Sequence, residues 1–263
     1  MDLGLENAEK ILDENFRLHA CRIPSVVEGM VVWEGNSLSY VDSGLSCDTF
    51  NIIHVKNTSI KLKDELRSAL GHYQRRGFSF CLWIRKGLIN DWLLGLFSEF
   101  GLAEQNEEPG MMLDLAAYEF EEPAQSANIV TAENHLQVMD YGNIMAANWT
   151  PVDKNVINYY STVSSQLLEN IHRIQFLIYY HQGIPAAGVE LFASDQKTLG
   201  LYGLATLKGF RGIGIGTALL KYTLLYAKKS GYEQVVLQAS QDGLPLYKKI
   251  GFEQVTTFFE YSF

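Results

Sequence analysis

The fold is decided by Ala205–Leu220, ATLKGFRGIGIGTALL, where an apolar strand pattern passes through a glycine-rich turn into a helical pattern. Without side chains at Gly212, Gly214 and Gly216, consecutive backbone N–H groups can converge on a phosphate. The N-terminus of the following helix adds partial positive charge, and the Thr217 hydroxyl can add a further donor. The stretch predicts an anion-binding loop between a strand and a helix.

Spacing separates this loop from two nucleotide-binding motifs. A Walker A loop ends in Gly-Lys-Ser/Thr, whereas Ile215–Thr217 reads IGT and lacks the lysine. A Rossmann fingerprint reads GxGxxG with an acidic residue about 20 positions later, whereas this loop reads GxGxG and has Val235 and Val236 at that place. An ATP or NAD site is therefore disfavoured.

The sequence around the loop predicts an α/β fold. Apolar runs separated by turn-forming residues indicate strands, and helical spacing behind the caps Thr131 and Asp153 indicates two helices before them. In chain order, the expected elements are helices over 133–148 and 153–171, strands over 174–181, 186–192 and 199–207, a helix over 217–230, a strand over 234–239, a helix over 244–250 and a strand over 252–261.

Three motifs of the C-terminal half resemble the GNAT superfamily of N-acetyltransferases. Arg211–Gly216 matches the R/Q-x-x-G-x-G/A motif, and VVLQAS at Val235–Ser240 and GLPLYKKIGF at Gly243–Phe252 follow in the order and spacing of that superfamily's coenzyme A site. The resemblance covers roughly 130–263. It implies a mixed, mostly antiparallel sheet in which two central parallel strands splay apart, with helices on both sides.

The resemblance also implies how acetyl-CoA is bound. Backbone groups on the strand before the loop would pair with the pantetheine arm, the loop would hold the pyrophosphate, and a serine after the next strand would contact the coenzyme, although that serine could instead cap the following helix. The implied cofactor-binding residues are Leu204, Thr206, Arg211, Gly212, Ile213, Gly214, Ile215, Gly216, Thr217 and Ser240. No metal is expected.

Two residues are candidates for the chemistry. Tyr247 occupies the place of the family's frequent general-acid tyrosine and could protonate the departing sulfur, or it could only pack beside the pantetheine. Many family members carry a glutamate on the strand before the loop, but 199–207 contains no acid. Glu190, on the preceding strand, is therefore the candidate general base, with an exposed strand residue or a contact to the substrate amine as the alternatives.

These residues together predict an N-acetyltransferase that moves an acetyl group from acetyl-CoA to a primary amine by direct attack in a ternary complex. A covalent route would need a nucleophile near the loop, yet Cys21, Cys47 and Cys81 all lie in the other half. The alternative is a non-catalytic acyl-CoA-binding sensor or scaffold. A small-molecule acceptor is expected rather than a protein, because no extended basic or peptide-binding motif is present.

The N-terminal half is expected to be a second α/β domain. The polar segment EFEEPAQS at 119–126 predicts a boundary near residue 125, dividing the chain into 1–125 and 126–263. The segment LFSEFGL at 96–102 echoes LYKKIGF at 246–252, which suggests a diverged GNAT-like copy. Because Phe97 stands in the place of the catalytic tyrosine, this half is expected to be structural or to shape the acceptor pocket.

Composition excludes several other classes. The net charge is -9 over 263 residues, and between Lys86 and Lys154 there is no basic residue, which argues against a nucleic-acid surface. No apolar window is long enough to span a bilayer, and the cysteines lack CxxC spacing. A cytoplasmic protein without nucleic-acid or membrane partners is expected, and the oligomeric state is left open.

Overall fold

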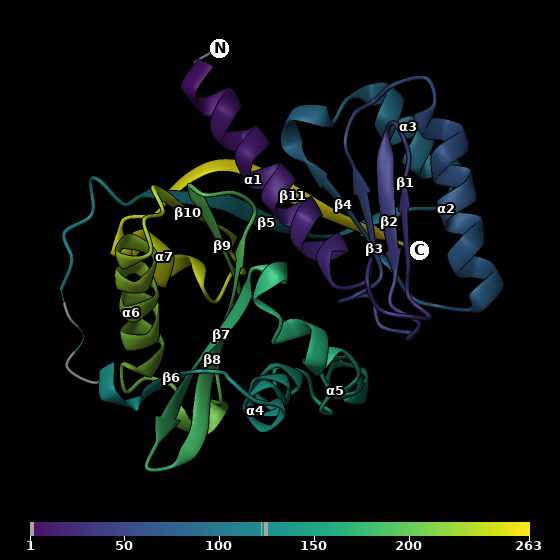
Figure 1. Ribbon diagram of the computed structural model, residues 1–263. Helices are drawn as coiled ribbons and strands as arrows, with labels where there is room; N and C mark the ends of the chain where they lie inside the picture. Colours follow the sequence, from purple (N-terminus) through teal and green to yellow (C-terminus); the bar gives the residue numbers. More distant parts are fainter. Residues whose placement is uncertain (1–2, 122, 124–125) are drawn as a thin grey trace.

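The computed structural model describes residues 3–121, 123 and 126–263, and within them eleven strands form one continuous sheet (Figure 1). The sheet order is β1-β2-β3-β4-β11-β5-β10-β9-β8-β7-β6. The strands are β1 (Val31–Glu34), β2 (Leu38–Asp42), β3 (Ile52–Val55), β4 (Cys81–Arg85), β5 (Ala103–Asp114), β6 (Ile129–Thr131), β7 (Ile174–His181), β8 (Ile184–Ala193), β9 (Thr198–Thr206), β10 (Gln234–Gln238) and β11 (Glu253–Ser262). The helices are α1 (Leu3–Arg22), α2 (Leu62–Arg76), α3 (Asp91–Glu99), α4 (His135–Ala146), α5 (Lys154–Leu167), α6 (Ile215–Lys229) and α7 (Leu244–Ile250).

Each half of the chain contributes a strand to the other half's part of the sheet. The C-terminal strand β11 lies between β4 and β5, and β5 in turn lies between β11 and β10. All of these pairings are antiparallel, with Phe258 opposite both Arg85 and Glu108, and Val235 opposite Leu113. The predicted boundary near residue 125 falls outside the described residues, so the division into two domains stays a prediction.

The elements expected around the glycine-rich loop are present in the expected order. Asp153 caps α5 by accepting a hydrogen bond from the Asn155 N–H. The prediction that Thr131 caps the preceding helix is wrong, because Thr131 ends the edge strand β6, and Asn134 caps α4 by accepting from the Gln137 N–H. Asparagine caps well because its side-chain oxygen reaches the free N–H groups of the first turn.

Helices cover both faces of the C-terminal part of the sheet. Leu219, Leu220 and Leu224 of α6 are buried against Leu199 and Leu201 of β9. On the other face, buried side chains of α4 and α5 pack with Phe176 of β7 and Phe192 of β8. The adjacent residues Phe176 and Leu177 of β7 enter opposite cores, as the pleat of a strand requires.

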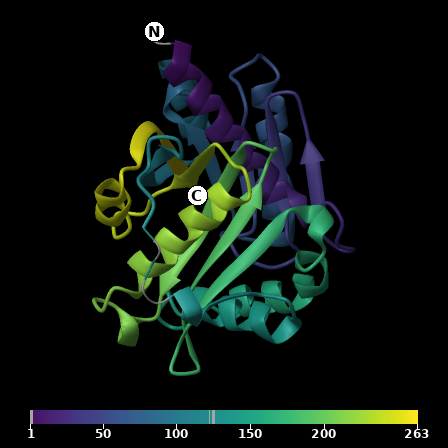
Figure 2. The ribbon, with the colours of Figure 1, turned by 60° about the vertical axis from the view of Figure 1, so that its left-hand side comes forward.

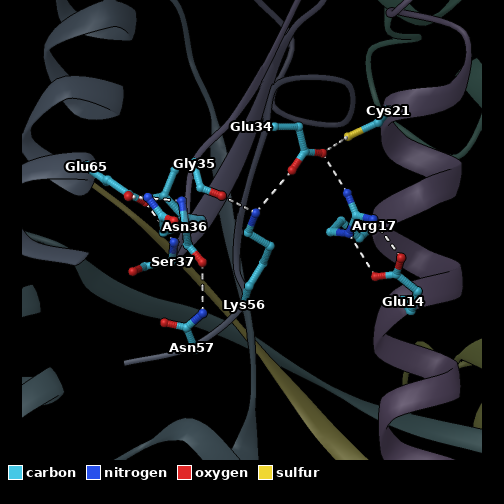
Figure 3. A network of polar contacts seen from close by, with 11 residues as sticks. Glu14, Arg17, Cys21, Glu34, Gly35, Asn36, Ser37, Lys56, Asn57 and Glu65 are labelled. Atoms are coloured by element: carbon cyan, nitrogen blue, oxygen red, sulfur yellow. Dashed lines mark hydrogen bonds and ion pairs between the residues drawn. The ribbon is translucent and has the colours of Figure 1, made fainter. Parts of the chain in front are cut away.

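The N-terminal helix α1 crosses the sheet where the two halves meet (Figures 1 and 2). Its apolar face buries Leu12 and Phe16. A polar face anchors it to the N-terminal half, because Arg17 donates to Glu34 at 2.6 Å as well as to Glu14 of its own helix, and Glu34 also pairs with Lys56 (Figure 3). None of the helices in the described part of the chain is long and apolar enough to cross a membrane.

Candidate active site

The two parallel strands at the centre of the C-terminal half separate partway along their length. Their last paired residues are Gly200 of β9 and Val236 of β10, yet β9 continues to Thr206 and β10 to Gln238. A β-bulge shifts the pairing of β8 with β9 just beyond this point, and Gly203 within it has a φ of 54°. The splayed pair predicted from the sequence is confirmed, and it opens a wedge beside β9.

The glycine-rich loop closes the wide end of this wedge. Gly212 and Gly214 have φ values of 78° and 87°, which side-chain-bearing residues rarely adopt. Gly214 is the N-cap of α6, and no side chain in the described part of the chain caps this helix, so its first N–H groups are left to meet an anion. The Arg211 Nε donates to the carbonyl oxygen of Thr206 at 2.9 Å and fixes the loop to the end of β9. These features fit the pyrophosphate of a coenzyme.

Wedge and loop open into one cleft of about 1270 Å³ that both halves line. Ile213 does not line it, since its side chain is 57% exposed on the outside of the loop. The candidate residues that do line it are Glu190, Leu204, Thr206, Arg211, Gly212, Gly214, Ile215, Gly216, Thr217, Ser240 and Tyr247.

Glu190 lies on the floor of the cleft with both carboxylate oxygens engaged. Its side chain is buried, Oε2 accepts a hydrogen bond from the Tyr160 hydroxyl at 3.0 Å, and Oε1 lies 2.8 Å from the Nε2 of His19. The His19 ring stacks on Tyr202 with ring centroids 3.7 Å apart. Because Tyr202 is the β9 residue opposite Glu190, this group lies at the bulge where β9 and β10 separate.

Tyr247 and Ser240 reach the cleft from the opposite side of the wedge. Tyr247 is buried, and burial together with the nearby charge of Glu108 raises the pKa of its phenol well above 10, so the hydroxyl stays protonated and can donate. The Ser240 Oγ accepts from the Gly243 N–H at 3.3 Å and so stabilises the turn into α7. The turn role and the coenzyme contact are compatible, because Ser240 also lines the cleft.

A pair of carboxyl groups on the N-terminal side of the cleft was not found from the sequence. Burial, and then the charge of Glu260, raises the pKa of Glu108 to about 7. Glu260 accepts from Asn106 at 3.2 Å and from the Cys81 thiol at 3.5 Å, and burial raises its pKa too. Two partly buried carboxyl groups that feel each other's charge resist ionising together.

Comparison with known proteins agrees with this geometry. Residues 172–254 match the family described as acetyltransferase (GNAT) domain. This segment of the chain is a GNAT acetyltransferase domain. The whole chain has no significant match among curated proteins. The matched segment contains Glu190, the loop and Tyr247, whereas His19, Glu108 and Glu260 lie outside it.

Solved structures share the fold over the whole or nearly the whole length of the chain. A GCN5-related N-acetyltransferase from Kribbella flavida has a TM-score of 0.67 and 14% identity, and the alignment covers 100% of this chain and 96% of that one. A tandem GNAT protein from the clavulanic acid biosynthesis pathway has a TM-score of 0.63 and 11% identity, with coverage of 98% and 94%. At such identities the likeness concerns the fold, which is consistent with two GNAT-like units in one chain.

Proposed function

We propose that this chain transfers an acetyl group from acetyl-CoA to a primary amine of a small molecule, by direct attack in a ternary complex. The observation that carries the proposal is that the uncapped, glycine-rich start of α6, the splayed strands and a carboxylate-rich wall all open into one cleft. A single cleft lets the amine and the thioester meet without a covalent enzyme intermediate.

The residues on the C-terminal side fit the coenzyme. The α6 N-terminus and Arg211 would hold its phosphates, and β9 from Thr206 back to Leu204 would pair with its amides, since among the described residues this edge has no strand partner beyond Gly200. Tyr247, kept protonated by its buried position, would supply a proton to the departing sulfur. When bound, the coenzyme supplies the activated acyl group.

The acceptor side of the cleft favours a cationic amine. Among the described residues that line the cleft, Arg211 is the only lysine or arginine, whereas the acids are Asp48, Glu108, Glu190, Asp242 and Glu260. Carboxylates at a partly enclosed site attract an ammonium group and raise its local concentration. Because the cleft is bounded by both halves, it suits a compact acceptor better than a folded protein surface.

Calorimetric titration with acetyl-CoA tests the cofactor site. Gly214→Asp adds a strained residue and a negative charge at the start of α6, so we expect at least a tenfold loss of affinity. Gly209→Asp is the matched control, because Gly209 is in the same loop but has open space around it and does not line the cleft.

Thiol release is then measured with a panel of mono- and polyamines. Turnover of at least one amine is expected, with N-acetylation of the product confirmed by mass spectrometry. Failure of the wild-type protein to bind acetyl-CoA, or binding without turnover of any amine, would contradict the proposed function.

A further inference from the structure

The N-terminal helix carries two polar residues on the face that packs against the C-terminal half. Asn15 and His19 are one helical turn apart and therefore point the same way. Asn15 is fully buried, accepts a hydrogen bond from the Tyr202 hydroxyl at 2.5 Å and donates to Ser194 at 2.8 Å. Gly200 permits this approach, because a Cβ there would lie 2.1 Å from Asn15 Oδ1. The helix is thus fixed over the point where the wedge begins.

His19 has a defined tautomer in this position. An ionised carboxylate can only accept, so the 2.8 Å contact with Glu190 requires the hydrogen on Nε2. The neutral ring then carries its lone pair on Nδ1. Within the described chain, Nδ1 has no hydrogen-bond partner and is not among the buried atoms left without one, so solvent reaches it.

The ring also lies where the acyl group would arrive. From Thr206, beside the loop, back to Tyr202 is four residues of β9, or about 13 Å at ~3.3 Å per residue. That length suits an extended pantetheine arm that runs along the unpaired edge. His19 stacks on Tyr202 and lines the cleft, whereas Glu190 beneath it is only 6% exposed.

We propose that His19, contributed by the N-terminal helix, is the general base of the acetyl transfer, and that Glu190 is a positioning residue that orients it. This inference rests on the proposed function. The bound ammonium group first releases one proton to solvent, and the Nδ1 lone pair then removes a second proton from the amine nitrogen as the N–C bond to the acetyl carbon forms. As the C–S bond breaks, its electron pair stays on sulfur, which takes a proton from Tyr247. One proton thus passes overall from nitrogen to sulfur, and His19 and Tyr247 exchange protons with solvent before the next turnover.

A histidine base explains why Glu190 is paired on both sides. A carboxylate that accepts from Tyr160 and from His19, and that is nearly sealed from the cleft, is well placed to fix a ring and badly placed to meet a substrate. The rival base is Glu108, which faces the same cleft. The experiment therefore includes both carboxylates.

The decisive variant is His19→Gln, because a glutamine amide can still donate to Glu190 but has no basic nitrogen. We expect kcat to fall about 10²- to 10⁴-fold, while the Kd for acetyl-CoA measured by calorimetry changes less than twofold. Added imidazole should restore part of the activity of His19→Ala. His72→Gln is the matched control, since His72 also pairs with a buried carboxylate, Asp42, and is as exposed as His19, with 21% against 20% of the side chain.

A second measurement does not depend on turnover. Nitrogen NMR of the histidine rings, with the His19 signal assigned by its loss in the variant, should show hydrogen on Nε2 and none on Nδ1 in the neutral form. A neutral ring protonated on Nδ1 would overturn the inference. The inference would also be overturned if His19→Gln kept a kcat within threefold of the wild type while Glu108→Gln or Glu190→Gln was inactive. A wild-type protein that acetylates no amine would instead reject the proposed function.

Discussion

Replacing Glu108 with glutamine should change how the stability of the protein depends on pH. Burial, and then the charge of Glu260, raises the pKa of Glu108 from its ordinary value of 4.5 to about 7, and Cys81 and Tyr247 are the other titratable groups that respond to its charge. No cation contributes to the shift. The folded protein therefore binds this proton more tightly than the unfolded chain does.

The sign and size of the effect follow from that difference. The proton on Glu108 stabilises the folded protein fully below pH 4.5, which is the pKa of this carboxyl in the unfolded chain. This stabilisation is lost as the pH rises through about 7, the pKa in the folded protein. A rise of about 2.5 pH units corresponds to roughly 3 kcal/mol in total, most of it between pH 5 and pH 8.5. Glutamine cannot ionise, so Glu108→Gln should gain roughly 2.5 kcal/mol relative to the wild type across that interval.

Urea denaturation at several pH values between 5 and 8.5 measures the difference in unfolding free energy between wild type and variant. Glu107→Gln is the control, because Glu107 is the neighbouring residue of β5 and is exposed. A difference between Glu108→Gln and wild type that stays constant over the whole pH range would refute the reasoning about the buried pair.

Two further variants probe the helix contact and the proposed acid. Gly200→Ala places a methyl group 2.1 Å from Asn15 Oδ1, so urea denaturation should show that the free energy of unfolding falls by roughly 1–3 kcal/mol. Gly209→Ala is the control, because Gly209 has open space around it, and its free energy of unfolding should stay within about 0.5 kcal/mol of wild type. Equal losses in the two variants would mean that the α1 contact is not tight. Tyr247→Phe should lower kcat on the order of 10²-fold at unchanged acetyl-CoA affinity, with Tyr222→Phe on α6 as the control, and an unchanged kcat would leave Tyr247 a packing role only.

The sequence predicts the strands and helices around the glycine-rich loop well because their signals are local. A strand, the glycine-rich loop and a helix follow each other within 199–230. The spacing of the apolar residues changes from the two-residue period of a strand to the 3.6-residue period of a helix across the loop. The errors there are small. Thr131 was assigned as a cap but lies in a strand, since an edge strand of three residues leaves almost no pattern.

The part of the cleft around His19, Glu108 and Glu260 is not predicted, because its residues come from distant parts of the chain. His19 of α1 contacts Glu190 of β8, and Glu108 of β5 responds to the charge of Glu260 on the paired strand β11, so each pair joins residues far apart in the sequence. One signal was present: in an N-terminal helix whose apolar face includes Leu12 and Phe16, Asn15 and His19 are polar residues at positions that ought to be apolar. Such positions indicate a buried polar contact, although not its partner.

The exchange of β5 and β11 also determines the order in which the protein can fold. Ile84 pairs with Phe259, so the sheet of the N-terminal half cannot be completed until β11 has been synthesised. Contacts between such distant residues slow folding, because the loop between them must close first. While the chain is still being synthesised, β4 and β5 lack their shared neighbour β11 and present unpaired strand edges. Such edges are surfaces on which chains aggregate. Once β11 is inserted, neither half can open without breaking the sheet of the other.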